Sequence, residues 1–149
     1  MVHGSNALAA DAASQTLGEG AVLVQVRVAR PTDKLEQVIA FYRDGLGLPE
    51  LFRFAGHVDY DGIMLGLPGK SVHLEFTQHA HGSPCPAPSL DNLIVLYITD
   101  ADAYERLNLR MHRMGYEAVA PENPYWLERS HTYEDPDGWR VVVCRETGI

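Results

Sequence analysis

The first regular pattern along the chain is an alternation of polar with β-branched residues over residues 22–29. A period of two is typical of a β-strand. We expect Pro31 to end this strand, because proline has no N–H to donate to a neighbouring strand. Apolar residues then recur at helical spacing between residues 35 and 42 and predict an amphipathic helix. We expect Gly45 and Gly47 to end this helix, because glycine readily takes the positive φ of a helix C-terminus.

Three strand-like segments follow this helix, and a tight turn separates the last two. Proline and glycine at residues 68–69 mark that turn. The expected strands span residues 50–54, 62–67 and 71–77.

The same succession of elements returns after residues 82–89, a segment with three prolines that reads as a linker. A β-rich run at residues 93–99 precedes Asp100, whose carboxylate can cap a helix. The apolar stripe of that helix ends at Met114, and Gly115 closes it. Further strands are expected at residues 116–120, 130–134 and 139–145, the last two joined by the turn at residues 135–138.

Each half therefore predicts a β-α-β-β-β module, and the chain is assigned to the α+β class. We expect residues 1–20 to be a flexible tail and residues 21–149 to form one domain. Its modules span about residues 21–81 and 91–147. One module cannot bury its sheet alone, so the two should pack together as one unit.

Composition narrows the functional classes. The chain has 149 residues, of which 46% are hydrophobic, and no apolar run reaches the roughly 18–20 residues that span a membrane. A net charge of −8 does not suit nucleic acid, which requires a basic surface. The two cysteines, Cys85 and Cys144, fit neither a disulfide framework nor a metal knuckle, and the N-terminus lacks the pattern of a secretory signal. These features favour a cytoplasmic protein that acts on neither nucleic acid nor membrane.

Two motifs carry a family resemblance: FYRDGLGL at residues 41–48 and EDPDGW at residues 134–139. Together with the tandem modules, they resemble the vicinal oxygen chelate superfamily. That superfamily holds glyoxalase I, extradiol dioxygenases, and fosfomycin- and bleomycin-resistance proteins. The resemblance covers about residues 21–147. It implies sheets that curl into a shared cup, a small-molecule ligand and a homodimer.

In metal-using relatives, four inward positions of the cup supply His, Gln or Glu ligands. The resemblance places these positions at Leu23, Glu75, Leu93 and Val142, with Asn92 as the alternative to Leu93 if the register slips by one residue. One carboxylate among aliphatic side chains does not meet the three or four donors that a cation such as Zn²⁺ requires. We therefore expect no metal and no other cofactor. A divalent metal remains the alternative.

Glu75 is the candidate catalytic residue, because a carboxylate on an apolar inward face would hold its proton more tightly and could act as a general base. The alternative is an ion pair with Arg27. By position, Arg27 matches an arginine that holds a substrate carboxylate in glyoxalase-type relatives, a task that suits the guanidinium fork. Gln25 can hydrogen-bond a ligand or Glu75.

The family pattern also turns Ser130 and Thr132 toward the cup, which leaves His131 facing the helices. The remaining candidate ligand contacts are His73 at the mouth of the cup, Tyr97 on its wall and Trp126 on its rim.

Two functional hypotheses follow. The first is a metal-free protein that binds or sequesters a small molecule, similar to bleomycin-resistance proteins, with an acidic surface suited to a cationic, partly planar ligand. The second is an enzyme of the superfamily, a lyase, isomerase or dioxygenase, that uses Glu75 as a base or as a ligand to a divalent metal.

Overall fold

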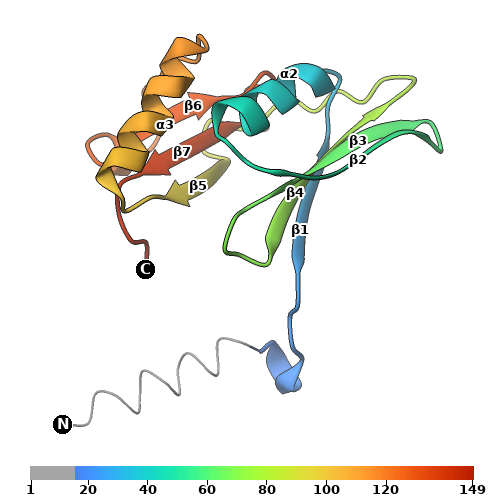
Figure 1. The fold of residues 1–149 in the computed structure, drawn as a ribbon, viewed down its shortest axis with the longest axis horizontal. Coiled ribbons are helices and arrows are strands. Elements are labelled where there is room, and N and C mark those ends of the chain that lie inside the picture. Colours follow the sequence, from blue (N-terminus) through green and yellow to red (C-terminus); the bar gives the residue numbers. More distant parts are fainter. Residues whose placement is uncertain (1–15) are drawn as a thin grey trace.

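The computed structural model describes residues 16–149, which form two mixed β-sheets, each accompanied by a helix (Figure 1). The flexible tail predicted for residues 1–20 lies mostly outside the described residues. Its last three residues form a short 3₁₀ turn, η1 (Gly18–Gly20). The α+β class and the tandem modules predicted from the sequence are confirmed.

The first module has a four-stranded sheet in the order β1-β4-β3-β2, in which β1 runs parallel to β4 and the other pairs are antiparallel. Its elements are β1 (Val26–Pro31), α2 (Leu35–Ile39), η2 (Ala40–Gly45), β2 (Glu50–His57), β3 (Tyr60–Gly66) and β4 (Val72–His79).

The second module has a three-stranded sheet in the order β5-β7-β6, with β5 parallel to β7. Its elements are β5 (Leu93–Tyr97), α3 (Ala101–Arg113), η3 (Pro124–Trp126), β6 (Ser130–Glu134) and β7 (Arg140–Cys144).

The prediction of a strand at residues 116–120 is wrong. Only Val119 pairs with a neighbour, through a single bridge to Thr132 of β6. The next carbonyl, that of Ala120, accepts a hydrogen bond from the Arg140 guanidinium at 3.0 Å, and Pro121 follows with no N–H to donate. The Arg140 side chain thus takes the hydrogen bond that a neighbouring strand would have made to Ala120. The second sheet therefore has one strand fewer than predicted.

The first strand is also displaced from its predicted range of 22–29. It begins at Val26, opposite Val72, because the turn that precedes β4 leaves residues 22–25 without a partner strand. Pro31 is its last residue rather than a residue beyond it. An edge strand tolerates this proline, and the ladder continues through the Thr32 N–H, which donates to the Thr77 carbonyl at 2.8 Å.

The first helix widens into a π-helical turn, η2, where the Leu46 N–H donates to the Phe41 carbonyl five residues earlier at 2.9 Å. Gly45 ends this turn against α3. A Cβ at Gly45 would lie 2.8 Å from the Met111 Sδ atom, and the Gly45 carbonyl accepts a hydrogen bond from Arg110 at 2.7 Å. Gly47 takes φ 84°, as predicted for a helix end. The glycine-rich motif therefore lets the helices of the two modules meet.

Helix α3 begins as the sequence predicts, because the Asp100 carboxylate accepts a hydrogen bond from the Ala103 N–H at 2.8 Å. Its buried face consists of Tyr104, Leu107 and Met111. Met114, expected on the same stripe, lies beyond the last helical residue and is 40% exposed. Within residues 16–149, no helix has both the length and the apolar character needed to cross a membrane.

One apolar core runs through both modules. Ile63, Leu65 and Phe76 of the first sheet pack beneath α2, and Val141 and Val143 of the second sheet join the same cluster. The two modules therefore bury apolar surface together, as expected for halves that are too small to fold alone. Both cysteines, Cys85 and Cys144, are free thiols.

A buried polar network also connects the modules. Arg30 of β1 donates to Asp135 at 2.5 Å and to Asp137 at 2.9 Å, and both aspartates belong to the turn between β6 and β7. The Tyr42 hydroxyl donates to the same Asp135 carboxylate at 2.7 Å. Burial and the neighbouring Asp135 charge raise the pKa of Tyr42 well above its usual value, so Tyr42 stays a donor.

The remaining acceptor positions of this network are also occupied. The other carboxylate oxygen of Asp135 accepts the N–H groups of Asp137 and Trp139 at 2.8 and 3.0 Å, and the Thr32 hydroxyl donates to Asp137 at 2.7 Å. The side chain of Asp135 has no exposed surface. Removal of any one partner would leave this buried charge uncompensated, which strongly destabilises a fold.

We predict that replacing Arg30 by methionine destabilises the protein by about 3 kcal/mol, because it leaves the buried Asp135 carboxylate without its counter-charge. The measurement is the free energy of unfolding from urea denaturation. Arg53→Met is the matched control: the Arg53–Glu36 pair is exposed at both ends and should be worth no more than about 1 kcal/mol. Equal losses in the two variants would contradict the proposed role of Arg30.

Candidate functional site

The face of the first sheet opposite α2 carries the residues that the sequence singles out. The strand register places Ala29, Glu75, Met64 and Phe52 in one row across the sheet, and side chains in one row share a face. Side chains two residues along each strand return to that face. The surface formed in this way is called the open face. It consists of Arg27, Ala29, Phe52, Phe54, Met64, His73, Glu75 and Thr77.

Three charged or polar side chains meet at one edge of the open face. Arg27 donates from Nε to the Nε2 atom of His73 at 2.9 Å, and its Nη1 atom lies 3.7 Å from the Oε2 atom of Glu75. The latter distance is an ion pair but not a hydrogen bond. The Arg27 side chain is 47% exposed, whereas that of Glu75 is 14% exposed. The guanidinium fork is therefore held in place while part of it faces solvent.

His73 is 4% exposed and acts as the hydrogen-bond acceptor of this group. Because its Nε2 atom accepts from Arg27, the neutral ring carries its proton on Nδ1. That Nδ1 atom is buried and has no hydrogen-bond partner among residues 16–149. The histidine that we expected at the mouth of the cup is thus a buried support beneath Arg27.

Aromatic side chains occupy the other end of the open face. Phe52 is 58% exposed, and its ring centroid lies 6.3 Å from that of Phe54. The Phe54 ring covers Gly62, where an added Cβ would lie 2.3 Å from the Phe54 Cζ atom. The open face therefore offers flat apolar area next to a partly exposed guanidinium, a combination suited to a planar ligand.

The second module holds the remaining candidate ligand contacts, and they lie apart from Arg27, His73 and Glu75. The Ser130 hydroxyl donates to the Trp126 carbonyl at 2.6 Å, Thr132 is 2% exposed, and Tyr97 is 45% exposed. Within the described residues, no hydrogen bond or ion pair joins them to Arg27, His73 or Glu75. A single chain therefore does not bring the two sets of predicted site residues together.

Two further predictions concern His131 and Gln25. His131 faces α3, as the alternation of β6 predicts, and its Nδ1 atom lies 2.7 Å from the Tyr104 hydroxyl. Gln25, expected on the face with Arg27, lies just before the first residue of β1. The structure therefore places His131 away from the Arg27 group.

The donor set at the expected metal position does not fit a cation. Leu23 lies three residues before β1, so the β1 side chain beside Glu75 is the cationic Arg27. Leu93 and Val142 offer only aliphatic groups. Residues 16–149 contain no group of three or more His, Cys, Asp or Glu side chains gathered for a metal ion. A guanidinium paired to the one available carboxylate takes the place that a metal would need.

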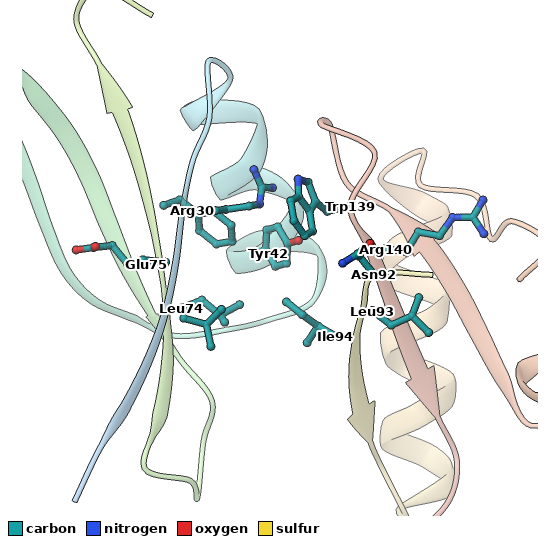
Figure 2. Close-up of a pocket in the computed structure, with 12 residues that line it drawn as sticks. Arg30, Tyr42, Leu74, Glu75, Asn92, Leu93, Ile94, Trp139 and Arg140 are labelled. Carbon is teal, nitrogen blue, oxygen red and sulfur yellow. The ribbon is translucent and has the colours of Figure 1, made fainter. Parts of the chain in front are cut away.

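A cavity of about 230 Å³ that was not predicted from the sequence lies between the two modules. Figure 2 shows Leu74 and Tyr42 of the first module facing Ile94 and Trp139 of the second, with Glu75 pointing away from them. This cavity, called the seam cavity, lies on the α2 side of the first sheet. Tyr42 and Trp139 belong to the two family motifs, but the motifs do not show that the two residues line one cavity, because they are distant in sequence.

Comparison with known proteins gives the family. The N-terminal part, residues 26–77, matches the family model of the YycE-like N-terminal domain, and residues 91–145 match the YycE-like C-terminal domain. The uncharacterized protein YycE of Bacillus subtilis (strain 168) is 46% identical over 125 residues, which cover 84% of this chain and 90% of YycE. The chain belongs to the YycE-like family.

Solved structures show the same fold. The crystal structure of Bacillus subtilis YycE, a protein of unknown function, superposes with a TM-score of 0.83 at 42% identity, covering 90% of this chain and 97% of YycE. The trypanothione-dependent glyoxalase I of Leishmania major superposes with a TM-score of 0.62 at 19% identity, covering 80% of this chain and 84% of the glyoxalase chain. TnmS3, an antibiotic-binding protein from Streptomyces sp. CB03234, superposes with a TM-score of 0.57 at 22% identity, covering 82% of this chain and 93% of TnmS3. The predicted membership of the glyoxalase, fosfomycin- and bleomycin-resistance superfamily is confirmed at the level of fold.

We predict that the purified protein takes up no divalent metal at the family position, because Arg27 occupies the space beside Glu75. Elemental analysis and a thermal-shift series with Ni²⁺, Zn²⁺, Mn²⁺ and Fe²⁺ test this, with Glu75→Ala as the comparison variant. Stoichiometric binding of one ion that disappears in Glu75→Ala would contradict the prediction.

Proposed function

We propose that this YycE-like protein binds a small planar molecule on its open face without a metal, and that Arg27 holds an anionic group of that molecule. The observation that carries the proposal is the way in which the Arg27 side chain is paired with its neighbours. Its Nε atom is used by the buried His73, whereas its nearest carboxylate, Glu75, stands at 3.7 Å. A guanidinium that is fixed but incompletely paired is ready to accept a carboxylate or phosphonate in a two-pronged contact.

The aromatic part of the open face supplies the rest of the contact. Phe52 and Phe54 lie on the same face as Arg27, on β2. The Arg27 Nη2 atom reaches the Sδ atom of Met64, the register partner of Phe52, at 3.6 Å, so a ring on these phenylalanines can place its anionic substituent toward the guanidinium. The antibiotic-binding protein TnmS3 has the same fold, which supports a binding role for this architecture. This proposal replaces the cationic ligand suggested by net charge alone, because Arg27 is the more exposed member of the Arg27–Glu75 pair on this face.

The binding proposal predicts a specific dependence on Arg27. Isothermal titration calorimetry with a series of aromatic carboxylates and phosphonates should give saturable binding to the unaltered protein. Arg27→Ala should lose at least about tenfold in affinity, the order expected for one charge-assisted hydrogen-bonding pair.

Arg53→Ala is the control, because Arg53 is an exposed arginine of the same sheet that is paired with Glu36. Equal affinity of the Arg27→Ala variant and the unaltered protein would overturn the assignment. Conversion of an added compound, lost in Glu75→Gln, would instead identify an enzyme of the superfamily with Glu75 as its base.

We further propose that two copies of the chain form a homodimer that completes the cup. In the single chain, apolar side chains on and near the open face remain exposed: Leu51 at 56%, Phe52 at 58% and Leu23 at 51%. The candidate residues of the second module do not reach Arg27 within one chain. A second copy can cover this surface and bring its own second module to the open face.

The dimer proposal predicts a mass of twice the 16.5 kDa of the chain in light scattering coupled to gel filtration. Phe52→Glu, which places a charge in the exposed apolar surface, should shift the protein to the monomer. Leu109→Glu on α3 is the control, because Leu109 is 47% exposed on a different element. A monomeric unaltered protein would contradict this proposal.

A further inference from the structure

The seam cavity is separated from the open face by the first sheet itself. Successive residues of β4 point to opposite faces, and Figure 2 shows Leu74 directed toward the cavity and Glu75 directed away from it. On β1, Val28 and Arg30 line the cavity, whereas Arg27 contacts His73 on the other face. Glu75 belongs to the cavity wall, but its side chain is directed to the open face, so a molecule in the seam cavity lies on the other side of the sheet from the Glu75 carboxylate and from Arg27.

The walls of the cavity are largely apolar and come from both modules. Leu74 and Phe76 of the first module belong to the buried core, and Ile94 of the second packs against it. Val28, at 53% exposure, stands at the accessible side. An apolar cavity of about 150 Å³ already accepts benzene in a folded protein. A volume of about 230 Å³ is therefore large enough for one or two fused aromatic rings.

Aromatic groups and a guanidinium form the deep end of the cavity. The Arg30 guanidinium carbon lies 4.9 Å from the Phe76 ring centroid and 5.4 Å from that of Trp139. A flat ligand between β1 and Trp139 would meet these ring and guanidinium surfaces.

The charges around the cavity determine which ligand it accepts. Arg30 is paired with two carboxylates, Asp135 and Asp137, so this group carries one net negative charge. The other lining arginine, Arg140, is paired with Glu134 at 2.8 Å. No cation among the lining residues is left over for an anionic ligand, and an anion entering the cavity would lose its hydration without compensation. The surroundings therefore favour a neutral or cationic molecule.

We propose that the seam cavity is a second ligand site, which binds a neutral or cationic aromatic molecule of one or two rings between the modules. This site goes beyond the proposed function of the open face and takes a ligand of different charge. Because its walls come from β1, η2 and β4 of the first module and from β5 and the start of β7 in the second, its ligand contacts both modules at once.

Trp139 provides a direct reporter of occupancy. Its indole N–H donates to the Cys85 carbonyl at 2.8 Å and gives its own signal in a ¹H–¹⁵N NMR spectrum. The Trp126→Phe variant assigns that signal, since the chain has two tryptophans. The probes are indole, tryptamine and indole-3-acetate, which share one ring system and are neutral, cationic and anionic.

Titration of the full chain with indole and with tryptamine should move the Trp139 signal to saturation, and indole-3-acetate should bind at least tenfold more weakly. Val28→Phe, which fills the accessible side of the cavity, should weaken indole binding at least tenfold. Val24→Phe is the matched control, since Val24 is also exposed, at 80%, but does not line the cavity; it should bind indole as the unaltered protein does.

Three results would overturn the proposal. The first is a Trp139 signal that does not respond to indole. The second is equal indole affinity in Val28→Phe and Val24→Phe. The third is binding of indole-3-acetate as tight as that of indole, since the charge argument would then be wrong.

Discussion

The pairing of Arg30 with Asp135 is the constraint on which the arrangement of the two modules depends. It joins the end of β1 to the turn between β6 and β7, and Tyr42 at the end of the first helix donates to the same carboxylate. Because the Asp135 side chain is fully buried and its acceptor positions are all used, a change in the relative placement of the modules would break this network. The apolar core can tolerate small shifts, whereas a buried charge that loses its partner cannot.

This placement gives the protein two surfaces of different chemistry on opposite sides of one sheet. The open face carries a guanidinium held by His73 and the exposed ring of Phe52. On the α2 side, the Arg30 network closes the end of an apolar cavity and leaves no free positive charge there. Two arginines three residues apart on β1 thus have opposite roles, since one is open to a ligand and the other is neutralised inside the fold.

Much of the fold could be predicted because it depends on local chemistry. The Asp100 cap, the positive φ of Gly47 and the alternation that turns His131 toward α3 are properties of a few neighbouring residues. The errors arose where a distant residue competes with the local preference. Arg140 takes the Ala120 carbonyl that a strand would have used, and the start of β4 at Val72 leaves residues 22–25 outside the sheet. Leu23, one of the four expected metal positions, therefore lies outside β1, whereas the predicted ion pair of Glu75 with Arg27 is formed.

The sequence by itself determined the repeat of the module, the family motifs and the residue types available for chemistry, because periodicity and turn residues are written in consecutive positions. Only the tertiary structure decided which of these residues meet. It buried His73 beneath Arg27, separated Ser130 and Thr132 from that group, and formed a cavity from strands of both halves. The reason is that strand register and module packing depend on contacts between residues far apart in the chain, and no local pattern specifies those contacts.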